Sequence, residues 1–435
     1  MKIPRRPHAP ASLGAFRVAG ALGLLFSVAT QGNAQSTDPL PGPTPAIVTA
    51  RTYRNVDSAD FIGAVGCSSS ICHGGGPSPI ATNVVTVGDR NAYTIWAARD
   101  AHAKSWATLA TERSARMAAA LGAGRAQETA RCTECHAPMQ LVNASRLGPL
   151  ARVENGISCE TCHGPAKFWI RSHTRKDLTH AQNVTTGLRD LENLYVRANS
   201  CIACHQVLPS DLQKAGHPPL VFELDAQSVA EPKHWKDSDE WSGPQAWLVG
   251  QAAALREMSW ALNKRETSGD LEREQWRSLL WLMRKTTDNM GGFPKFEYLT
   301  DIEMSPGNLA RAQSTADDLA RAASARTWDA GTTRRLMDVL AASDGDFTGG
   351  KETPLALQNR AVRLTLALSR LLAPFEARDK ERWAKPSEEM QKLFIANDAR
   401  LEFDAAKFVS ALQAFQKSLA YAGSDEAAPK QTAAR

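Results

Sequence analysis

Apolar side chains in the second half of the chain recur every three or four residues, the period of one buried helix face. Four such stripes are present: Trp247, Gln251, Ala254, Leu255, Met258 and Leu262; Trp276, Leu279, Leu280 and Met283; Leu357, Ala361, Leu364, Leu368 and Leu371; and Phe408, Leu412, Phe415 and Leu419. Residues 291–292, 305–307 and 349–350 carry the glycines and prolines that separate helices. The pattern predicts an antiparallel α-helical domain over residues 240–420, with the stripes as its core.

The first half of the chain has a different pattern, in which short apolar segments alternate with loops that contain glycine and proline. Its longest predicted helix runs from Thr94 to about Leu121, a stretch rich in Ala, Leu, Met and Arg. Residues 35–57 are rich in proline and predict an extended leader. Residues 421–435 predict a disordered tail. The predicted fold class is therefore mainly α, with a domain of little regular structure over residues 58–235 before the helical one.

The first 34 residues have the order of a secretory signal peptide: a basic leader, an apolar run over residues 18–29 and small residues at 32–34. The apolar run is shorter than the roughly 20 residues of a membrane span, and no later stretch reaches that length. We therefore expect a chain exported to the periplasm, or beyond the cell, that does not span the membrane. Cleavage removes four positive charges and lowers the formal net charge from +5 to about +1, so the charge gives no indication of nucleic-acid binding.

All eight cysteines lie in the first half of the chain, and three pairs of them stand in the pattern C-x-x-C-H. These motifs are residues 132–136 (CTECH), 159–163 (CETCH) and 201–205 (CIACH). Two thiols at this spacing reach the two vinyl groups along one edge of a porphyrin, and the adjoining histidine then binds the iron. A redox dithiol, a zinc site or disulfides are the alternatives. Three such motifs in one exported chain favour covalent haem.

The remaining two cysteines form a longer version of the same motif, residues 67–73 (CSSSICH). A small disulfide loop beside an unrelated histidine is the alternative to a fourth haem site. No other cysteine is left to pair, and histidine again follows the second cysteine directly. The sequence thus predicts four covalently bound haems c. The attachment residues would be Cys67, Cys72, Cys132, Cys135, Cys159, Cys162, Cys201 and Cys204, with His73, His136, His163 and His205 as the proximal iron ligands.

Five further histidines lie within or just beyond the cysteine-bearing region, and none occurs in the last 200 residues or so. Four haems with two axial histidines each would need four of these five as distal ligands. His102 is preferred because it lies in a predicted helix remote from any attachment motif, and His173 and His217 come next. His180 and His234 remain open. Met117 and Met139 are thioether alternatives, although core packing suits Met139 better.

The motifs resemble those of tetrahaem cytochrome c-554 and the wider cytochrome c-552/4 domain family. The resemblance covers roughly residues 60–235 and is carried by residues 101–103 (AHA) with Trp106, by residues 156–165 (GISCETCHGP) with His173, and by residues 201–205. It implies closely stacked haem pairs, mostly with two histidine ligands, and a protein that shuttles electrons between redox partners. It also implies that one haem, here the one on His136, is five-coordinate. The longer first motif and the large C-terminal extension depart from the family.

Two functions follow as expectations. The first is a periplasmic electron-transfer protein or relay subunit whose donor and acceptor are other redox proteins, and it is the preferred one. The second is an oxidoreductase in which one open-coordinate haem acts on a small nitrogen or sulfur species. The residues define no proton donor or cationic group for such an enzyme, so no catalytic residue is assigned. The tryptophans at 235, 241 and 247 either cover a haem edge or form a core between the domains.

The longer first motif gives the sharpest prediction of the sequence. Haem quantitation by pyridine haemochrome should find four haems per mature chain. A Cys67→Ala/Cys72→Ala variant should retain three, because both thiols that hold the first haem are then absent. Three haems in the unaltered chain would show that residues 67–73 do not attach one.

Overall fold

The computed structural model describes residues 60–75, 90–206, 208–235, 240–265, 269–297, 299, 304–350, 352–398 and 402–424, all within one compact unit. The predicted signal peptide and extended leader lie outside these residues. Helices dominate the described part of the chain, where the β-structure found is a single isolated bridge between Phe61 and Leu147. The prediction of a mainly α fold is confirmed.

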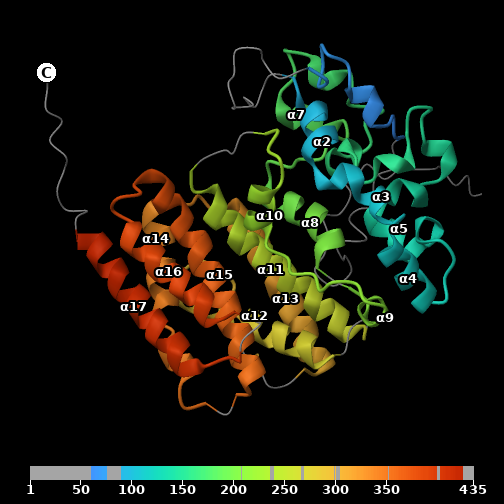
Figure 1. Ribbon diagram of the computed structural model, residues 1–435. Coiled ribbons are helices and arrows are strands. Elements are labelled where there is room, and N and C mark those ends of the chain that lie inside the picture. The colour runs from blue at the N-terminus through green and yellow to red at the C-terminus, as the bar shows by residue number, and fades with distance from the viewer. Residues whose placement is uncertain are drawn as a thin grey trace, which may run out of the picture. The chain divides into compact units, whose positions relative to one another are not determined.

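The second half of the chain forms long helices that pack side by side (Figure 1). They are α11 (Ser242–Asn263), α12 (Asp270–Asn289), α13 (Pro306–Ala325), α14 (Ala330–Ala341), α15 (Pro354–Arg378), α16 (Ala384–Ala396) and α17 (Ala405–Ser424), with a short 3₁₀ turn, η8 (Asp344–Phe347), before α15. The breaks lie where glycine and proline predict them. Helix α13, for example, begins with Ser305 as its N-cap and Pro306 in its first turn. Helix α17 extends four residues into the predicted disordered tail, which is a correction to that boundary.

The predicted stripes form the core of this half. Trp247 on α11 and Trp276 on α12 are among the largest fully buried side chains, and Phe408 and Phe415 on α17 are fully buried as well. Each such side chain removes enough apolar surface from water to contribute roughly 1.5–3 kcal/mol. Helix α11 is buried on almost every side, since it packs against α8, α10, α12, α13 and α15. It is the central helix of this half.

The first half consists of short helices and 3₁₀ turns joined by loops. The α-helices are α2 (Ala92–Arg99), α3 (Ser105–Thr108), α4 (Glu112–Ala120), α5 (Ala130–His136), α6 (Cys159–His163), α7 (His180–Thr185), α8 (Leu194–His205), α9 (Ser210–Lys214) and α10 (Leu224–Ala230). The 3₁₀ turns are η1 (Ala64–Cys67), η2 (Ala101–Lys104), η3 (Ala126–Glu128), η4 (Pro138–Leu141), η5 (Ala144–Arg146), η6 (Val153–Asn155) and η7 (Ser172–Thr174).

The single helix predicted over Thr94–Leu121 is wrong, because the chain breaks at Asp100 and again near residue 110. The backbone of Asp100 is extended (φ −81°, ψ 129°), and its carboxylate accepts the backbone N–H of His102 as an N-cap. An aspartate that caps the next turn competes with continuation of its own helix. Helix propensity summed over the stretch does not detect this local competition.

Helix α8, which ends in the last C-x-x-C-H motif, is anchored in the helical half (Figure 1). Its Tyr195 hydroxyl donates to Asp317 on α13 at 2.7 Å, and its Asn199 side chain accepts from Arg256 on α11 at 2.6 Å. Arg256 and Asp317 pair at 2.6 Å with only 1% of either side chain exposed. A buried network of this kind fixes one geometry, since every partner depends on the others.

Two of the three tryptophans at the start of the helical half belong to its core. Trp241 and Trp247 are buried in the main cluster, and Trp241 packs against Phe375 at a ring-centre distance of 5.0 Å. Trp235 differs, because its ring lies edge-on to His234 at 5.2 Å. The core alternative therefore holds for Trp241 and Trp247, whereas Trp235 lies against a candidate iron ligand.

Replacement of Asp317 by Ala should destabilise the holoprotein by about 3–5 kcal/mol, because Arg256 and the Tyr195 hydroxyl then lose a buried partner. Chemical denaturation followed by far-ultraviolet circular dichroism measures the change. The matched control is Glu388→Ala, which removes the exposed pair with Lys385 and should cost about 1 kcal/mol or less. Equal effects of the two variants would contradict the importance of the buried network.

Candidate functional site

Each C-x-x-C-H motif forms the end of a helix. Helices α5, α6 and α8 all terminate at the histidine of their motif, His136, His163 and His205. Cysteines three residues apart in a helix lie on the same face. The helical turn thus directs both thiols to one side and leaves the imidazole at the helix end, the arrangement that attachment along one porphyrin edge requires.

The longer motif reaches a similar arrangement by a different route. Its Cys67 ends the 3₁₀ turn η1, and the two additional residues form a tight turn in which the Cys72 amide donates to the Ser69 carbonyl at 2.8 Å. The His73 amide then donates back to the Cys67 carbonyl at 3.2 Å. The loop thereby closes on itself and keeps Cys67, Cys72 and His73 together.

The structure places each motif histidine opposite one histidine from elsewhere in the chain. The ring-centre distances are 6.2 Å for His73–His173, 6.0 Å for His102–His205, 6.5 Å for His136–His217 and 6.4 Å for His163–His234. The ring planes are nearly parallel in the His73–His173 pair (12°) and inclined by 62° to 87° in the other three, so no common ring orientation relates the pairs. The four pairs instead share one separation that leaves room between the rings.

That separation is the one expected when a single metal ion lies between two imidazoles. A bond from an imidazole nitrogen to a first-row metal is about 2 Å long. The ring centre lies about 1 Å behind that nitrogen, given ring bonds of roughly 1.3–1.5 Å. Two such ligands on opposite sides therefore have ring centres about 6 Å apart. The donor set of eight thiols and eight imidazoles fits four haem groups with two histidine ligands each.

His180 stands apart from these pairs. It is exposed at the start of α7, and its Nε2 lies 3.0 Å from a carboxylate oxygen of Asp190. The other four candidates, His102, His173, His217 and His234, each face a motif histidine. Met139 is 2% exposed and lies among the buried apolar residues, as core packing predicts.

The Nδ1 atoms of five of the paired histidines have oxygen partners. Four of them face backbone carbonyls: His136 that of Ser105 at 3.2 Å, His173 that of Trp169 at 3.3 Å, His217 that of Pro218 at 2.8 Å and His234 that of Pro232 at 3.3 Å. A carbonyl only accepts, so these bonds place the proton on Nδ1 and leave Nε2 as the ligand atom. The fifth, His102, faces the carboxylate of Asp100 at 3.1 Å.

Glu160 joins the first and third motifs, although in the sequence it is only a spacer residue of C-x-x-C-H. Its carboxylate is 1% exposed and accepts the backbone N–H groups of Ile62, Gly63 and Ala166 at 2.9, 2.7 and 2.7 Å. Burial raises the pKa of Glu160 even though these three bonds favour the ionised form. The bonds hold the segment before Cys67 against α6.

The four pairs are neighbours in space in an order that differs from the chain. The Cys67 and Cys159 thiols are hydrogen-bonded, which lowers the pKa of Cys67 and raises that of Cys159. Burial, followed by the charges of His234, Arg189, His73 and His173, lowers the pKa of His163 to about 4. Burial, followed by His102 and His136, lowers the pKa of His205 to about 4. The four sites are numbered by the order of their cysteine motifs, so that His73, His136, His163 and His205 belong to the first, second, third and fourth. The first site is thus next to the third, and the fourth is next to the second.

Two contacts complete this order. The hydroxyl of Ser105 donates to the carbonyls of both His102 and His136 at 2.8 Å, so the fourth and second sites share one segment. Cys162 and Cys201 are electrostatic neighbours: burial, followed by the Cys162 charge, raises the pKa of Cys201. The third and fourth sites thus lie within range of an electrostatic interaction.

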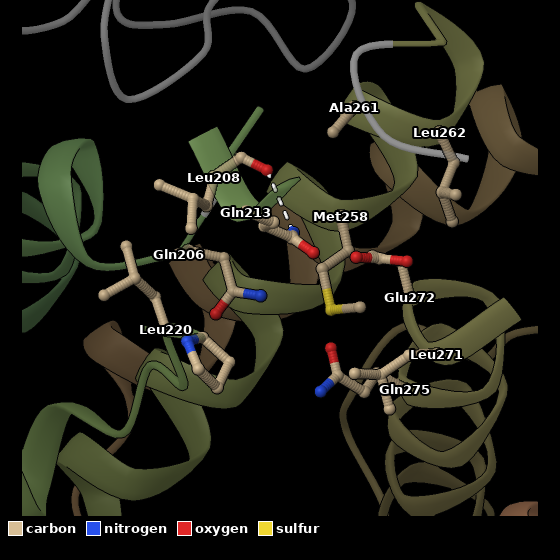
Figure 2. A pocket seen from close by; sticks show the side chains of 11 residues that line it. Gln206, Leu208, Gln213, Leu220, Met258, Ala261, Leu262, Leu271, Glu272 and Gln275 are labelled. Atoms are coloured by element: carbon tan, nitrogen blue, oxygen red, sulfur yellow. Dashed lines mark hydrogen bonds between the residues drawn. The ribbon is translucent and has the colours of Figure 1, made fainter. Parts of the chain in front are cut away.

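A small cavity lies beside the fourth site (Figure 2). Its volume is about 40 Å³, enough for water but far below the roughly 300–1,000 Å³ of ligand pockets. Gln206, Leu208, Met258, Leu262 and Glu272 are among the residues that line it. The sulfur of Met258 and the side-chain amides of Gln206 and Gln275 point into this space in Figure 2. The cavity does not define a substrate site.

Residues 89–164 match a family model described as cytochrome c554 and c-prime. The match covers α2 to α6 and includes the second and third motifs with His102. It supports a c-type cytochrome family and the covalent haem c that such proteins carry. No curated protein and no solved structure matches the chain. Among the described residues, no helix is long and apolar enough to cross a membrane.

Exchange of Glu160 for Gln should loosen the junction between the first and third motifs. A glutamine offers one acceptor oxygen in place of two, so at least one of the three N–H groups loses its partner, at a cost of about 1–3 kcal/mol. Hydrogen exchange should show faster exchange of the Ile62, Gly63 and Ala166 amides. Glu154→Gln, an exposed position in the turn before α6, should leave those amides unchanged. Unaltered protection in the Glu160 variant would contradict the role assigned to this carboxylate.

Proposed function

We propose that this protein is an exported, periplasmic tetrahaem c-type cytochrome that transfers electrons between redox partners. The observation that supports it most strongly is the set of four histidine pairs, each about 6 Å apart and each including the histidine of a cysteine motif. The basic and apolar leader supports export. The donor and the acceptor would be other redox proteins, and the chain would act alone or as a subunit of a larger redox complex.

The residues divide into three roles in this proposal. The eight cysteines hold the porphyrin edges, and His73, His136, His163 and His205 bind the irons from the proximal side. The distal ligands are His173 opposite His73, His217 opposite His136, His234 opposite His163 and His102 opposite His205. His180 has no ligand role, since its partner is Asp190.

When bound, haem c supplies an iron that accepts and returns one electron at a time. The chain would hold each iron between two imidazoles, and at every site at least one of the two has an Nδ1 hydrogen-bond partner. Covalent attachment and two strong axial ligands leave little to rearrange when the charge on the iron changes. The protein thereby favours fast exchange of electrons and occupies the positions that a substrate would need.

The spatial order of the pairs defines the route of the relay. The Cys67–Cys159 interaction, the electrostatic interaction between Cys162 and Cys201, and the Ser105 contacts with the His102 and His136 segments support the order first, third, fourth, second. The ends of this route are the sites of His73 and His136, and partners would exchange electrons there. The helical half supports the route at the fourth site through α8.

The pairing of His136 with His217 favours a carrier over an enzyme. The family resemblance assigns the open iron to the haem on His136, where an enzyme would bind its substrate. Here His217 faces His136 at 6.5 Å, and its Nδ1 is held by the Pro218 carbonyl. A sixth ligand in this position closes the site to small nitrogen or sulfur species.

A pair of histidine variants tests this assignment. His217→Ala should convert one of four low-spin haems to a high-spin form that binds cyanide, because the haem on His136 loses its sixth ligand. His180→Ala is the matched control and should leave all four haems low-spin. Electron paramagnetic resonance of the oxidised holoprotein gives both answers.

The opposite outcome would change the function. A high-spin haem already present in the unaltered protein, and no further change in His217→Ala, would show an open iron at His136. The enzyme alternative would then replace the carrier. A high-spin haem created by His180→Ala would overturn the distal assignment itself.

A further inference from the structure

His102 is the one paired histidine whose Nδ1 partner in the described structure is a carboxylate. The Asp100 oxygen lies 3.1 Å from His102 Nδ1, and the Asp100 side chain is 4% exposed. The Nδ1 partners of His136, His173, His217 and His234 are neutral backbone carbonyls. His205, on the other side of the same site, has the neutral side-chain amide of Gln227 at 3.3 Å.

The fourth site also has a second acidic side chain nearby. The ligand atoms of Asp100, His102 and Glu231 all lie within 4.8 Å of one another. The three groups would suit a separate metal ion by composition, but the imidazole of His102 already faces His205.

We propose that Asp100 is a positioning residue that lowers the reduction potential of the haem held between His205 and His102. The inference rests on the proposed function. A carboxylate that accepts a hydrogen bond from the Nδ1–H group makes an imidazole more basic and a stronger donor to its metal. It also adds a negative charge in a buried place, where charges act strongly. Both effects stabilise ferric iron, the more positive of the two oxidation states.

The redox step itself is simple. When bound, the haem would supply the one-electron couple, and the electron would come from the titrant or the redox partner. His102 and His205 would hold the iron in both oxidation states, and the proton on His102 Nδ1 would stay in place. Removal of the carboxylate charge should therefore raise the potential of this one haem and leave the other three near their original values.

Asp100→Asn isolates the charge from the structural role of the residue. Asp100 also caps η2 by accepting the His102 backbone N–H at 2.9 Å, and asparagine is an equally good N-cap. Its amide oxygen can still accept from Nδ1, as the carbonyls do at the other sites. Asp100→Glu keeps the charge, so the potential of this haem should stay close to its value in the unaltered protein.

The experiment is a spectroelectrochemical titration of the four-haem protein and its variants. His102→Met marks the wave of this haem, because a methionine ligand raises the potential. Asp100→Asn should raise the same wave, and Glu231→Gln should raise it by a smaller amount. Asp190→Asn removes the carboxylate from the 3.0 Å contact with His180 and should move no wave.

The outcomes separate this inference from the proposed function. Four haems with a His102→Met effect, but no shift in Asp100→Asn, would overturn the role of Asp100 alone. A shift in a wave other than the one marked by His102→Met would also overturn it. Fewer than four haems, or no effect of His102→Met on any wave, would overturn the ligand assignment of the proposed function. If Asp100→Asn fails to retain haem, the titrations of Glu231→Gln and Asp100→Glu test the electrostatic effect in its place. That effect would be contradicted if Glu231→Gln shifted no wave and Asp100→Glu, which keeps the charge, altered the potential.

Discussion

One distance constrains the first half of this protein: the separation that two imidazole rings need if a single iron is to lie between them. About 6 Å is set by bond lengths, and the chain meets it four times with partners that come from distant segments. Regular secondary structure does little to achieve this. Short helices, caps and backbone hydrogen bonds place each ring instead, as the Ser105 hydroxyl does for the His102 and His136 segments.

The helical half helps to position the histidine pairs, because it holds one of the helices that carry a cysteine motif. Helix α8 carries the fourth motif and is held on its other face by α11 and α13. The buried contacts of Tyr195 and Asn199 with Asp317 and Arg256 fix its rotation and position. A haem whose attachment helix cannot move has fixed distances to its neighbours, and electron transfer depends steeply on those distances. In the proposed relay, the C-terminal extension is therefore the support of the fourth haem.

The sequence predicts much of this structure, for reasons that differ between its parts. The helical stripes and their breaks are local periodic patterns, and the cysteine motifs are short, so both can be read directly. The five candidate distal histidines follow from composition, but their partners do not. His102 and His205, for instance, are far apart in the chain and meet only through tertiary packing. Nothing local distinguishes His234, a ligand candidate, from His180.

Three residues with important contacts carry only weak sequence signals. Glu160 is a spacer in a cysteine motif, and its role appears only when the amides of the distant Ile62 and Gly63, together with that of the nearby Ala166, converge on it. Ser105 resembles an ordinary helix residue. Asp100 interrupts a stretch of strong helix formers two residues before His102, and the spacing Asp-x-His is the one clue that a carboxylate supports that ligand. Helix propensity summed over residues 94–121 outweighs this spacing and predicts a continuous helix.

Electron paramagnetic resonance of the oxidised holoprotein, recorded before and after addition of nitric oxide or cyanide, tests the central claim most directly. Four histidine pairs around four irons predict four low-spin haems per chain and no change when either small molecule is added. A high-spin signal that shifts on addition of the ligand would contradict the claim, because it would show that at least one iron lacks the second imidazole.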